Sequence, residues 1–419
     1  MSVSMSRCFA FRTRFLVAAV LPMLLAAGCG KSPTAPVLPP LSSVVLSPAI
    51  DTLQVGQVRM FTATATDTGG APVPEATFLW SSSDPGIFTV NFAGRVTGVG
   101  EGCALLIAEA GGLRDTAEIF VFAQAGWYAQ TSSTSSTLNG VFFDSDGRNG
   151  WAVGVGGTIR ATADAGVTWK NQVSNTGFNL QGVWFTSTGE GWTVGDAGTI
   201  RHLAPGDSIW TFVGSNASED LLDVCFATPD TGWVVGAAGL ILRTVDRGAT
   251  WSRQLRGGGA ALRSVSFAGT REGWAVGDGG VILGTHDRGL SWFTYQPSVT
   301  GLSLRSVWRR SESRAFAVGQ QGVAPRTVSG PDSTVWELRT AGAANQLEGV
   351  FYPTDAIGYT VGFNGVGIVM RTDDGGLTWQ SQTANSQFRL KDVFFVDAQR
   401  GWAVGESGVI IHTSRGGLP

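Results

Sequence analysis

Short runs that alternate apolar with polar residues, separated by glycine-rich turns, make up most of this chain of 419 residues. Residues 61–65 read Phe-Thr-Ala-Thr-Ala, and the turn cluster Asp-Thr-Gly-Gly follows at residues 67–70. Alternation with a period of two predicts half-buried strands, and glycine beside aspartate predicts tight turns between them. We therefore expect an all-β protein.

An internal repeat of about forty residues governs the chain from residue 126 to its end, a period that is typical of propellers and solenoids. Each copy has a first strand with a valine and a second strand with an aromatic residue that leads into Val-Gly. The valines are Val141, Val183, Val224, Val265, Val307, Val350 and Val393. The aromatic residues are Trp151, Trp192, Trp233, Trp274, Phe316, Tyr359 and Trp402. These seven copies predict a seven-bladed β-propeller over residues 126–419.

The seventh copy stops after its third strand, although the other copies continue into a fourth strand that begins with tryptophan. Residues 127–132 match the fourth strands at residues 169–174 and 379–383. A strand placed ahead of the first copy completes the last copy only if the array closes into a circle. We expect the strand that begins at Trp127 to pair beside residues 409–413 and to close blade seven.

A turn of the form Thr-x-Asp-x-Gly-x-Thr/Ser-Trp follows the third strand in four copies. It resembles the Asp-box of bacterial neuraminidase (BNR) repeats. In that motif the aspartate accepts backbone hydrogen bonds within the turn, the glycine permits the bend, and the tryptophan packs between blades. The resemblance implies a structural role for Asp164, Asp246, Asp287 and Asp374.

The repeats with Trp-Ala-Val-Gly and an Asp-box also resemble the propellers of photosystem II stability and assembly factors. The similarity extends over residues 126–419 and implies a seven-bladed, non-enzymatic scaffold. The domain that precedes the propeller is not part of that family's pattern, so we do not carry over a photosynthetic role.

That family is associated with an arginine-rich patch on the propeller, and this chain has a basic column in its third strands. The column contains Arg243, Arg326, Arg371 and His412, with His202 at the same place in the second copy. Ala161 and Gly284 interrupt it in the first and fourth copies. A one-sided basic arc could dock an acidic partner surface. The alternative is that long polar side chains simply cover a strand.

The hairpins between second and third strands share one face in propellers, and ligands commonly bind on that face. We expect this rim to carry Asp196, Asp278, Gln320, Gln321, Phe363, Asn364, Glu406 and Ser407. The rim is the best candidate for a binding surface. Ordinary solvated turn residues are the alternative interpretation.

Residues 42–122 resemble the bacterial Ig-like group 2 family. The resemblance rests on the order of Val-Gly-Gln at residues 55–57, Trp-Ser-Ser-Ser-Asp-Pro at residues 80–85 and Gly-Arg-Val-Thr-Gly at residues 94–98. It implies an N-terminal Ig-like β-sandwich that presents the propeller rather than performing chemistry. We expect Trp80 to pack in its core.

The N-terminus has the pattern of an export signal, because Arg7, Arg12 and Arg14 precede an apolar run over residues 15–27. Residues 25–29 read Leu-Ala-Ala-Gly-Cys and resemble the lipobox of bacterial lipoproteins. The resemblance implies that residues 1–28 are removed as a signal peptide and that Cys29 is lipidated. An ordinary secretory signal with an incidental cysteine is the alternative.

Residues 29–41 are rich in proline and small polar residues and are expected to form a tether. The chain is therefore predicted to be an exported lipoprotein, held at a membrane by the lipid on Cys29. Gly30 gives no acidic retention signal after that cysteine, which favours an outer membrane or cell surface.

Composition narrows the function classes. The formal net charge is −3, which argues against nucleic acid as a partner. Cys103 and Cys225 fall in different predicted domains, and the three histidines are scattered, so neither a metal nor another cofactor is expected.

A sialidase would need an arginine cluster, a tyrosine–glutamate pair and an acid. The chain has only four tyrosines and no Arg-Ile-Pro or Arg-Leu-Pro segment. We therefore expect a non-enzymatic, extracytoplasmic binding or assembly scaffold for a protein or glycan partner. A sialidase-like glycoside hydrolase with Asp-box repeats is the alternative.

Overall fold

The computed structural model describes residues 39–122, 126–254, 259–296, 298–311, 313–329, 334–342 and 344–418. The chain forms two compact units, Met1–Ala123 and Gln124–Pro419. Within the described ranges, no helix is long and apolar enough to cross a membrane.

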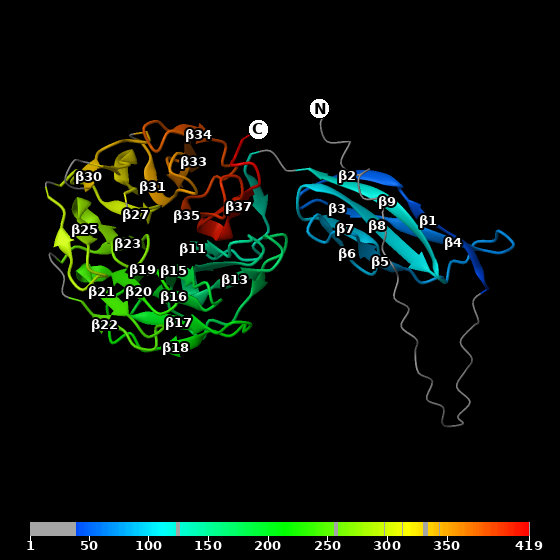
Figure 1. Cartoon of the computed structure of the whole chain (residues 1–419), viewed down its shortest axis with the longest axis horizontal. Helices are drawn as coiled ribbons and strands as arrows, with labels where there is room; N and C mark the ends of the chain where they lie inside the picture. Colours follow the sequence, from blue (N-terminus) through cyan, green and yellow to red (C-terminus); the bar gives the residue numbers. More distant parts are fainter. Residues whose placement is uncertain are drawn as a thin grey trace, which may run out of the picture. The chain divides into compact units, whose positions relative to one another are not determined.

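The N-terminal unit is built from three small sheets around one apolar core (Figure 1). Its strands are β1 (Leu41–Ser47), β2 (Ile50–Gln54), β3 (Val58–Met60), β4 (Thr62–Asp67), β5 (Leu79–Ser82), β6 (Phe88–Val90), β7 (Arg95–Gly98), β8 (Gly102–Ala110) and β9 (Leu113–Phe122). They pair as β1-β4, β2-β9-β8-β5 and β3-β7-β6. Phe61, Phe88 and Leu106 are buried in the core, and Trp80 packs against it. The unit is all-β, and its Ig-like assignment stays a prediction.

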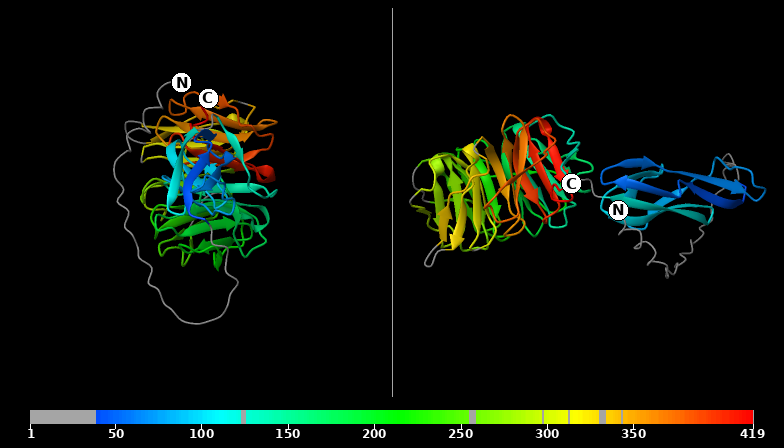
Figure 2. Two further views of the ribbon diagram at one scale, coloured as in Figure 1. Left: turned by 90° about the vertical axis from the view of Figure 1, so that its right-hand side faces the viewer. Right: turned by 90° about the horizontal axis from the view of Figure 1, so that it is seen from above.

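The second unit is a β-propeller of seven four-stranded antiparallel sheets in a ring (Figures 1 and 2). The strands of the first three blades are β11 (Leu138–Phe143), β12 (Gly150–Gly154), β13 (Ile159–Thr162) and β14 (Lys170–Asn171); β15 (Leu180–Phe185), β16 (Gly191–Gly195), β17 (Thr199–Leu203) and β18 (Thr211–Val213); and β19 (Leu221–Phe226), β20 (Gly232–Gly236), β21 (Ile241–Thr244) and β22 (Ser252–Arg253). The all-β propeller expected from the repeats is confirmed.

The next three blades have the same order from the axis outward. Their strands are β23 (Leu262–Phe267), β24 (Gly273–Gly277), β25 (Ile282–Thr285) and β26 (Phe293–Thr294); β27 (Leu304–Arg309), β28 (Ala315–Gly319), β29 (Arg326–Ser329) and β30 (Thr334–Glu337); and β31 (Gln346–Phe351), β32 (Gly358–Phe363), β33 (Gly367–Thr372) and β34 (Gln380–Gln382). Single 3₁₀ turns join second and third strands at η2 (Val155–Gly157), η3 (Ala237–Gly239), η4 (Asp278–Gly280), η5 (Gln320–Gly322) and η6 (Glu406–Gly408).

Blade seven is assembled from both ends of the propeller. Its strands are β35 (Leu390–Phe395), β36 (Gly401–Gly405), β37 (Ile410–Thr413) and β10 (Tyr128–Gln130). The antiparallel register pairs Tyr128 with His412 and Gln130 with Ile410. The first strand of the unit thus supplies the outer strand of its last sheet, so the ring has no open seam.

Trp127 locks this closure. Its side chain is 1% exposed, and its ring meets the rings of Tyr359 and Phe395 edge-on at centroid distances of 6.4 and 5.8 Å. Its indole Nε1 donates to Gln382 Oε1 at 2.8 Å, and Asn385 Nδ2 donates to its carbonyl oxygen at 2.7 Å. The closing strand is therefore fixed by apolar contacts and by hydrogen bonds at once.

One kind of aromatic contact joins neighbouring blades at six of the seven junctions. The second-strand aromatic of one blade lies against an aromatic residue at the end of the following blade's first strand, as in Trp233 on Phe267 at 3.6 Å and Trp402 on Phe143 at 3.6 Å across the closure. The other such pairs are Trp151–Phe185, Trp192–Phe226, Phe316–Tyr352 and Tyr359–Phe395. Blade five differs because Arg309 stands where the other first strands have an aromatic residue.

The Asp-box turn of the following blade covers this aromatic contact. Gly248, with a φ of +72°, lies so close to Trp192 that an added Cβ would overlap the indole ring. Gly289 lies in the same way against Trp233. Glycine is thus required in the turn both for its positive φ and for the close approach.

Replacing Trp127 with alanine should destabilise the propeller by about 3–5 kcal/mol, because a large buried side chain and its hydrogen bond are lost at the closure. Leu290→Ala is the matched control, since this side chain is 62% exposed, and it should change stability by less than about 0.5 kcal/mol. Urea denaturation followed by tryptophan fluorescence measures both. Equal midpoints for the two variants would show that the closing strand does not hold the ring together.

Candidate functional site

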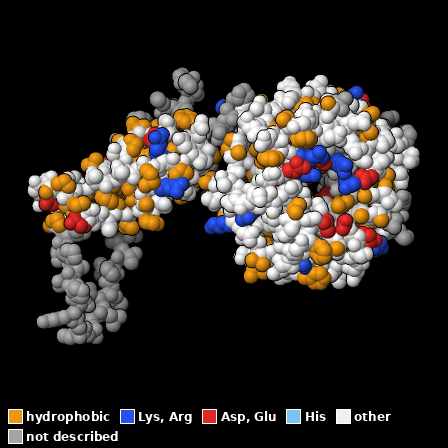
Figure 3. Space-filling view, turned by 180° about the vertical axis from the view of Figure 1, so that it is seen from behind, with side chains coloured by type: hydrophobic (Ala, Val, Ile, Leu, Met, Phe, Trp, Pro, Cys, Tyr) orange, Lys and Arg blue, Asp and Glu red, His pale blue; other side chains and the backbone are white. Residues whose placement is uncertain are grey.

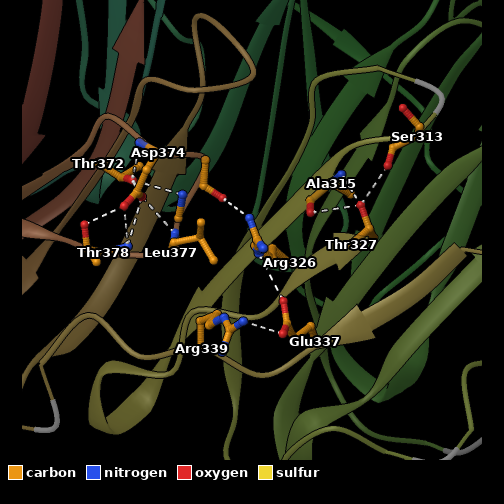
Figure 4. A network of polar contacts seen from close by, with 12 residues as sticks. Ser313, Ala315, Arg326, Thr327, Glu337, Arg339, Thr372, Asp374, Leu377 and Thr378 are labelled. Atoms are coloured by element: carbon orange, nitrogen blue, oxygen red, sulfur yellow. Dashed lines mark hydrogen bonds and ion pairs between the residues drawn. The ribbon is translucent and has the colours of Figure 1, made fainter. Parts of the chain in front are cut away.

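The four Asp-box aspartates are used within their own turns. Asp374 Oδ1 accepts the Thr378 backbone N–H at 2.9 Å, and its Oδ2 accepts the Thr378 hydroxyl at 2.6 Å (Figure 4). The Thr372 hydroxyl donates to Oδ1 at 2.8 Å. Asp164, Asp246 and Asp287 make the same contacts. Their oxygens are therefore occupied by the turn.

The hydrogen bonds also keep the carboxylate of Asp287 ionised. In the third complete turn, the hydrogen bond from the Ser291 hydroxyl lowers the pKa of Asp287 to about 2, and the Ser291 backbone N–H adds to the effect. A carboxylate with such a low pKa is a poor general acid.

The arginines of the basic column tie neighbouring blades together. Arg326 Nη1 donates to the Gly375 carbonyl oxygen of the next blade at 2.9 Å, and its Nε lies 3.3 Å from Glu337 Oε2 (Figure 4). Arg371 Nη1 donates to the Gly416 carbonyl oxygen at 3.0 Å. The two side chains are only 12% and 11% exposed.

His412 and Arg243 also lie between blades. His412 is 4% exposed, its Nδ1 is 2.9 Å from the Gly401 carbonyl oxygen, and its ring stacks on Trp402 at 4.4 Å. Burial lowers the pKa of His412 to about 4 and lowers the pKa of Arg243. The imidazole is therefore neutral at physiological pH.

The structure therefore contradicts the prediction that Arg243, Arg326, Arg371 and His412 form an exposed basic arc. Each residue is the cross-strand partner of a second-strand aromatic, as Trp402 is of His412. Paired side chains share one sheet face, and that face packs on the next blade. The column serves the contact between blades instead of a partner.

The residues expected on the rim do share one face, where the first strands begin. Asp278 binds Arg263 through two hydrogen bonds of 2.9 and 2.7 Å. Asp196 accepts Gln181 Nε2 at 2.8 Å. Both partners are second residues of first strands, so these contacts point from the rim toward the axis.

The other rim residues bind to the same face. Glu406 Oε1 lies 3.6 Å from Arg389 Nε. Gln320 Oε1 accepts the Ser303 backbone N–H at 3.2 Å, and Asn364 Nδ2 donates to Asn345 Oδ1 at 3.1 Å.

A cavity of about 230 Å³ opens at the centre of this face. In each first strand the residue directly after the buried leucine lines this cavity, and we call these seven residues the channel mouth. They are Asn139, Gln181, Leu222, Arg263, Arg305, Glu348 and Lys391. In Figure 3, blue and red side chains gather around a hollow at the centre of the ring. The sequence analysis did not predict this group, to which every first strand contributes one residue.

Charges at the channel mouth are only partly balanced. Arg263 is paired with Asp278, and Glu348 Oε1 accepts Arg389 Nη1 at 2.8 Å. Arg305 and Lys391 make no ion pair with any residue that the structure describes. Two cations on neighbouring sides of Glu348 are therefore available to a ligand.

Two carboxylates line the cavity one residue deeper. Asp223 accepts the Ser264 hydroxyl at 2.8 Å and the Val265 N–H at 3.0 Å, and Asp392 accepts the Val141 N–H at 2.9 Å. Burial raises the pKa of Asp223 to about 6. Burial, together with the charge of Asp223, raises the pKa of Asp392 to about 7.

Below the carboxylates the channel narrows to a second cavity of about 80 Å³, lined by the repeat valines and by aromatic side chains. The aromatic lining is Phe142, Trp184, Trp308, Phe351 and Phe394. The channel thus changes from charged to apolar along its length.

The residues needed for sialidase chemistry are not assembled at the mouth. Tyr128, Tyr352 and Tyr359 are buried between blades, and the hydroxyl of Tyr295 accepts the Trp336 backbone N–H at 3.0 Å. Among the described residues, no group of three His, Cys, Asp or Glu side chains is placed to hold a metal ion. Cys225 is buried and makes no disulfide.

One family model matches two stretches of the propeller. Residues 203–299 and 328–418 match the family model described as photosynthesis system II assembly factor YCF48. No curated protein matches the chain.

Solved structures share the fold at low sequence identity. YCF48 bound to D1 peptide is 21% identical over 70% of this chain and 96% of that chain, with a TM-score of 0.58. YCF48 from Cyanidioschyzon merolae is 20% identical over 69% and 98%, also with 0.58. Catalytically inactive virginiamycin B lyase from Staphylococcus aureus, with quinupristin, is 12% identical over 70% and 99%, with 0.61. The fold thus occurs in an assembly factor and in a lyase, and does not decide the function.

The two deep carboxylates should make stability depend on pH. Their folded-state pKa values of about 6 and 7 exceed the ordinary 3.8, so the folded protein keeps protons that the unfolded chain releases. Their unfavourable contribution to the free energy of unfolding is complete above pH 7, where both are ionised in the folded protein, and it disappears as the pH falls toward 4. We expect carboxyl ¹³C NMR to show two aspartates that titrate near 6 and 7.

Asp223→Ser provides the matched test, because serine occupies this position in blades four and five as Ser264 and Ser306. The pKa of Asp392 should fall in this variant, since the charge of Asp223 helps to raise it. Titration of both aspartates near 4 in the unaltered protein would contradict the burial described here.

Proposed function

We propose that the propeller is a non-enzymatic scaffold that holds a peptide segment of a protein partner at the channel mouth. The observation that carries the proposal is the unbalanced pair of cations, Arg305 and Lys391, at the entrance of a polar cavity on the axis. The similarity to YCF48 supports it, because a YCF48 structure contains a bound D1 peptide.

The dimensions of the cavity favour a peptide side chain as the ligand. A volume of about 230 Å³ is smaller than the usual 300–1,000 Å³ of a small-molecule or cofactor site. The volume suits one or two side chains from a segment that lies across the face. Such a segment would place its remaining residues over the surrounding rim.

The chemistry of the mouth favours an acidic segment. Arg305 and Lys391 attract a carboxylate, and the amides of Asn139 and Gln181 on other blades add hydrogen-bonding groups. The deeper Asp223 and Asp392 would repel a carboxylate pushed further in. An acidic side chain would therefore be held at the entrance.

We also propose that the protein is exported and lipidated on Cys29, with the N-terminal unit acting as an Ig-like spacer. This proposal rests on the lipobox-like sequence and the signal-like run before it. Residues 1–38 lie outside the described residues. A lipid anchor would keep the propeller at a membrane surface, where an assembly scaffold meets its partners.

Charge reversal at the mouth tests the binding proposal. Peptides enriched from a display library against the full-length protein should be acidic. Arg305→Glu combined with Lys391→Glu should raise the Kd of the best peptide by about tenfold or more, because two attractive charges become repulsive. Fluorescence anisotropy measures the affinities.

The control reverses two exposed arginines on the opposite face, Arg310→Glu with Arg415→Glu, which changes net charge by the same amount. This control should bind the peptide like the unaltered protein. If both double variants bind the peptide equally weakly, the loss reflects net charge alone, and the channel mouth is not the binding site.

Cys29→Ala tests the anchor. In cells fed with an alkyne-labelled fatty acid, the unaltered protein should be labelled and should sediment with membranes, whereas the variant should carry no label. Cys225→Ala serves as the control, since that thiol is buried in the propeller. Labelling of the Cys29 variant would exclude this residue as the acylation site.

A further inference from the structure

Trp151 is the exception in the column of second-strand aromatics. The other six members are at most 4% exposed, but Trp151 is only partly buried. In blades five, six and seven a cationic or imidazole side chain of the third strand is the cross-strand neighbour of the aromatic residue. Blade one has Ala161 at that place, which is too short to cover an indole ring.

The second cover of Trp151 is also missing. The turn of blade two, residues 203–210, reads Leu-Ala-Pro-Gly-Asp-Ser-Ile-Trp, whereas residues 372–379 of blade six form a complete Asp-box. Pro205 replaces the aspartate that organises the turn, and Asp207 replaces the glycine that contacts the aromatic ring. Because a Cβ at the equivalent Gly248 would overlap Trp192, Asp207 cannot approach Trp151 as closely.

The loss of these two covers coincides with a cavity of about 670 Å³ between blades one and two. Aromatic lining comes from Trp151 and Phe185, whose rings stack at 3.6 Å. The carboxylates of Asp144 and Asp207 also line it. None of the residues that line this cavity is basic. It lies where first strands end, on the face opposite the channel mouth.

We propose that this cavity binds an arginine side chain supplied by a partner protein. The two carboxylates complement a cation, and the aromatic lining suits a planar guanidinium. Asp207 is exposed, and Asp144 accepts the Asn149 amide at 2.6 Å with lone pairs to spare. A carbohydrate could also use aromatic rings and carboxylates, but it gains nothing from the absence of basic side chains.

The other blades show how a guanidinium fits such a place. Arg371 lies over the ring of Tyr359 at 5.7 Å and donates to the Gly416 carbonyl oxygen of the next blade. Arg326 reaches Gly375 of the next blade in the same way. Gly206, which lines the cavity, is the equivalent residue in the turn of blade two. A partner's arginine would thus place beside Trp151 the guanidinium group that the chain's own Arg371 places beside Tyr359.

The test uses the full-length protein labelled with 5-fluorotryptophan and solubilised in mild detergent. Acetyl-Gly-Arg-Gly-amide is the probe, and its citrulline counterpart is the uncharged match. The ¹⁹F resonance of Trp151, assigned with Trp151→Phe, should shift saturably with the arginine peptide and stay unchanged with citrulline. Asp207→Asn should weaken binding by about threefold, as expected for an exposed ion pair.

Ala161→Arg should abolish the ¹⁹F shift of Trp151, because the new side chain fills the cavity from within the chain, as Arg371 covers Tyr359 in blade six. Ala163→Arg and Asp355→Asn are the matched controls, since both residues are exposed and do not line the cavity. They should bind like the unaltered protein. Equal shifts with the citrulline peptide, or a shift with N,N′-diacetylchitobiose and none with arginine, would overturn the proposal.

Discussion

The contact between the aromatic residue of one blade's second strand and the first strand of the next blade is the interaction on which this propeller depends. In several blades a close-approaching glycine of the neighbouring turn covers this contact, as Gly248 and Gly289 do, and in several a third-strand arginine or histidine covers it as well. Trp127 extends this arrangement across the closure. The Asp-boxes and the basic column first suggest chemistry, but their side chains are engaged in the turns and in the contacts between blades. Function must therefore come from positions that packing leaves free.

The fold could be predicted from the sequence because its determinants repeat. Valine and aromatic columns recur in every blade, since each copy meets the same neighbours, and the incomplete seventh repeat implies a strand from elsewhere. The exposed basic arc was wrong because a repeat does not reveal which sheet face packs on the next blade. His412 shows this, being basic in sequence and fully enclosed in the structure.

The channel mouth could not be found by the same reasoning. Its members, among them Asn139, Glu348 and Lys391, occupy one column but differ in chemistry, so they give no repeat signal. Only closure of the ring brings them to one axis. The hint in the sequence is a charged residue directly after a leucine and two positions before the repeat valine, as in Leu262-Arg263-Ser264-Val265. The cavity beside Trp151 likewise arises where repeat features are lost, at Ala161 and Asp207.

The proposed binding site lies on the axis of the propeller, and in-cell photo-crosslinking tests this proposal most directly. A p-benzoylphenylalanine placed at Leu222 lines the channel mouth, whereas one at Asp355 is exposed on the opposite face. We expect position 222 to form an adduct with one partner protein and position 355 not to form it. An adduct with the same partner from position 355, and none from position 222, would show that the channel mouth is not the binding site.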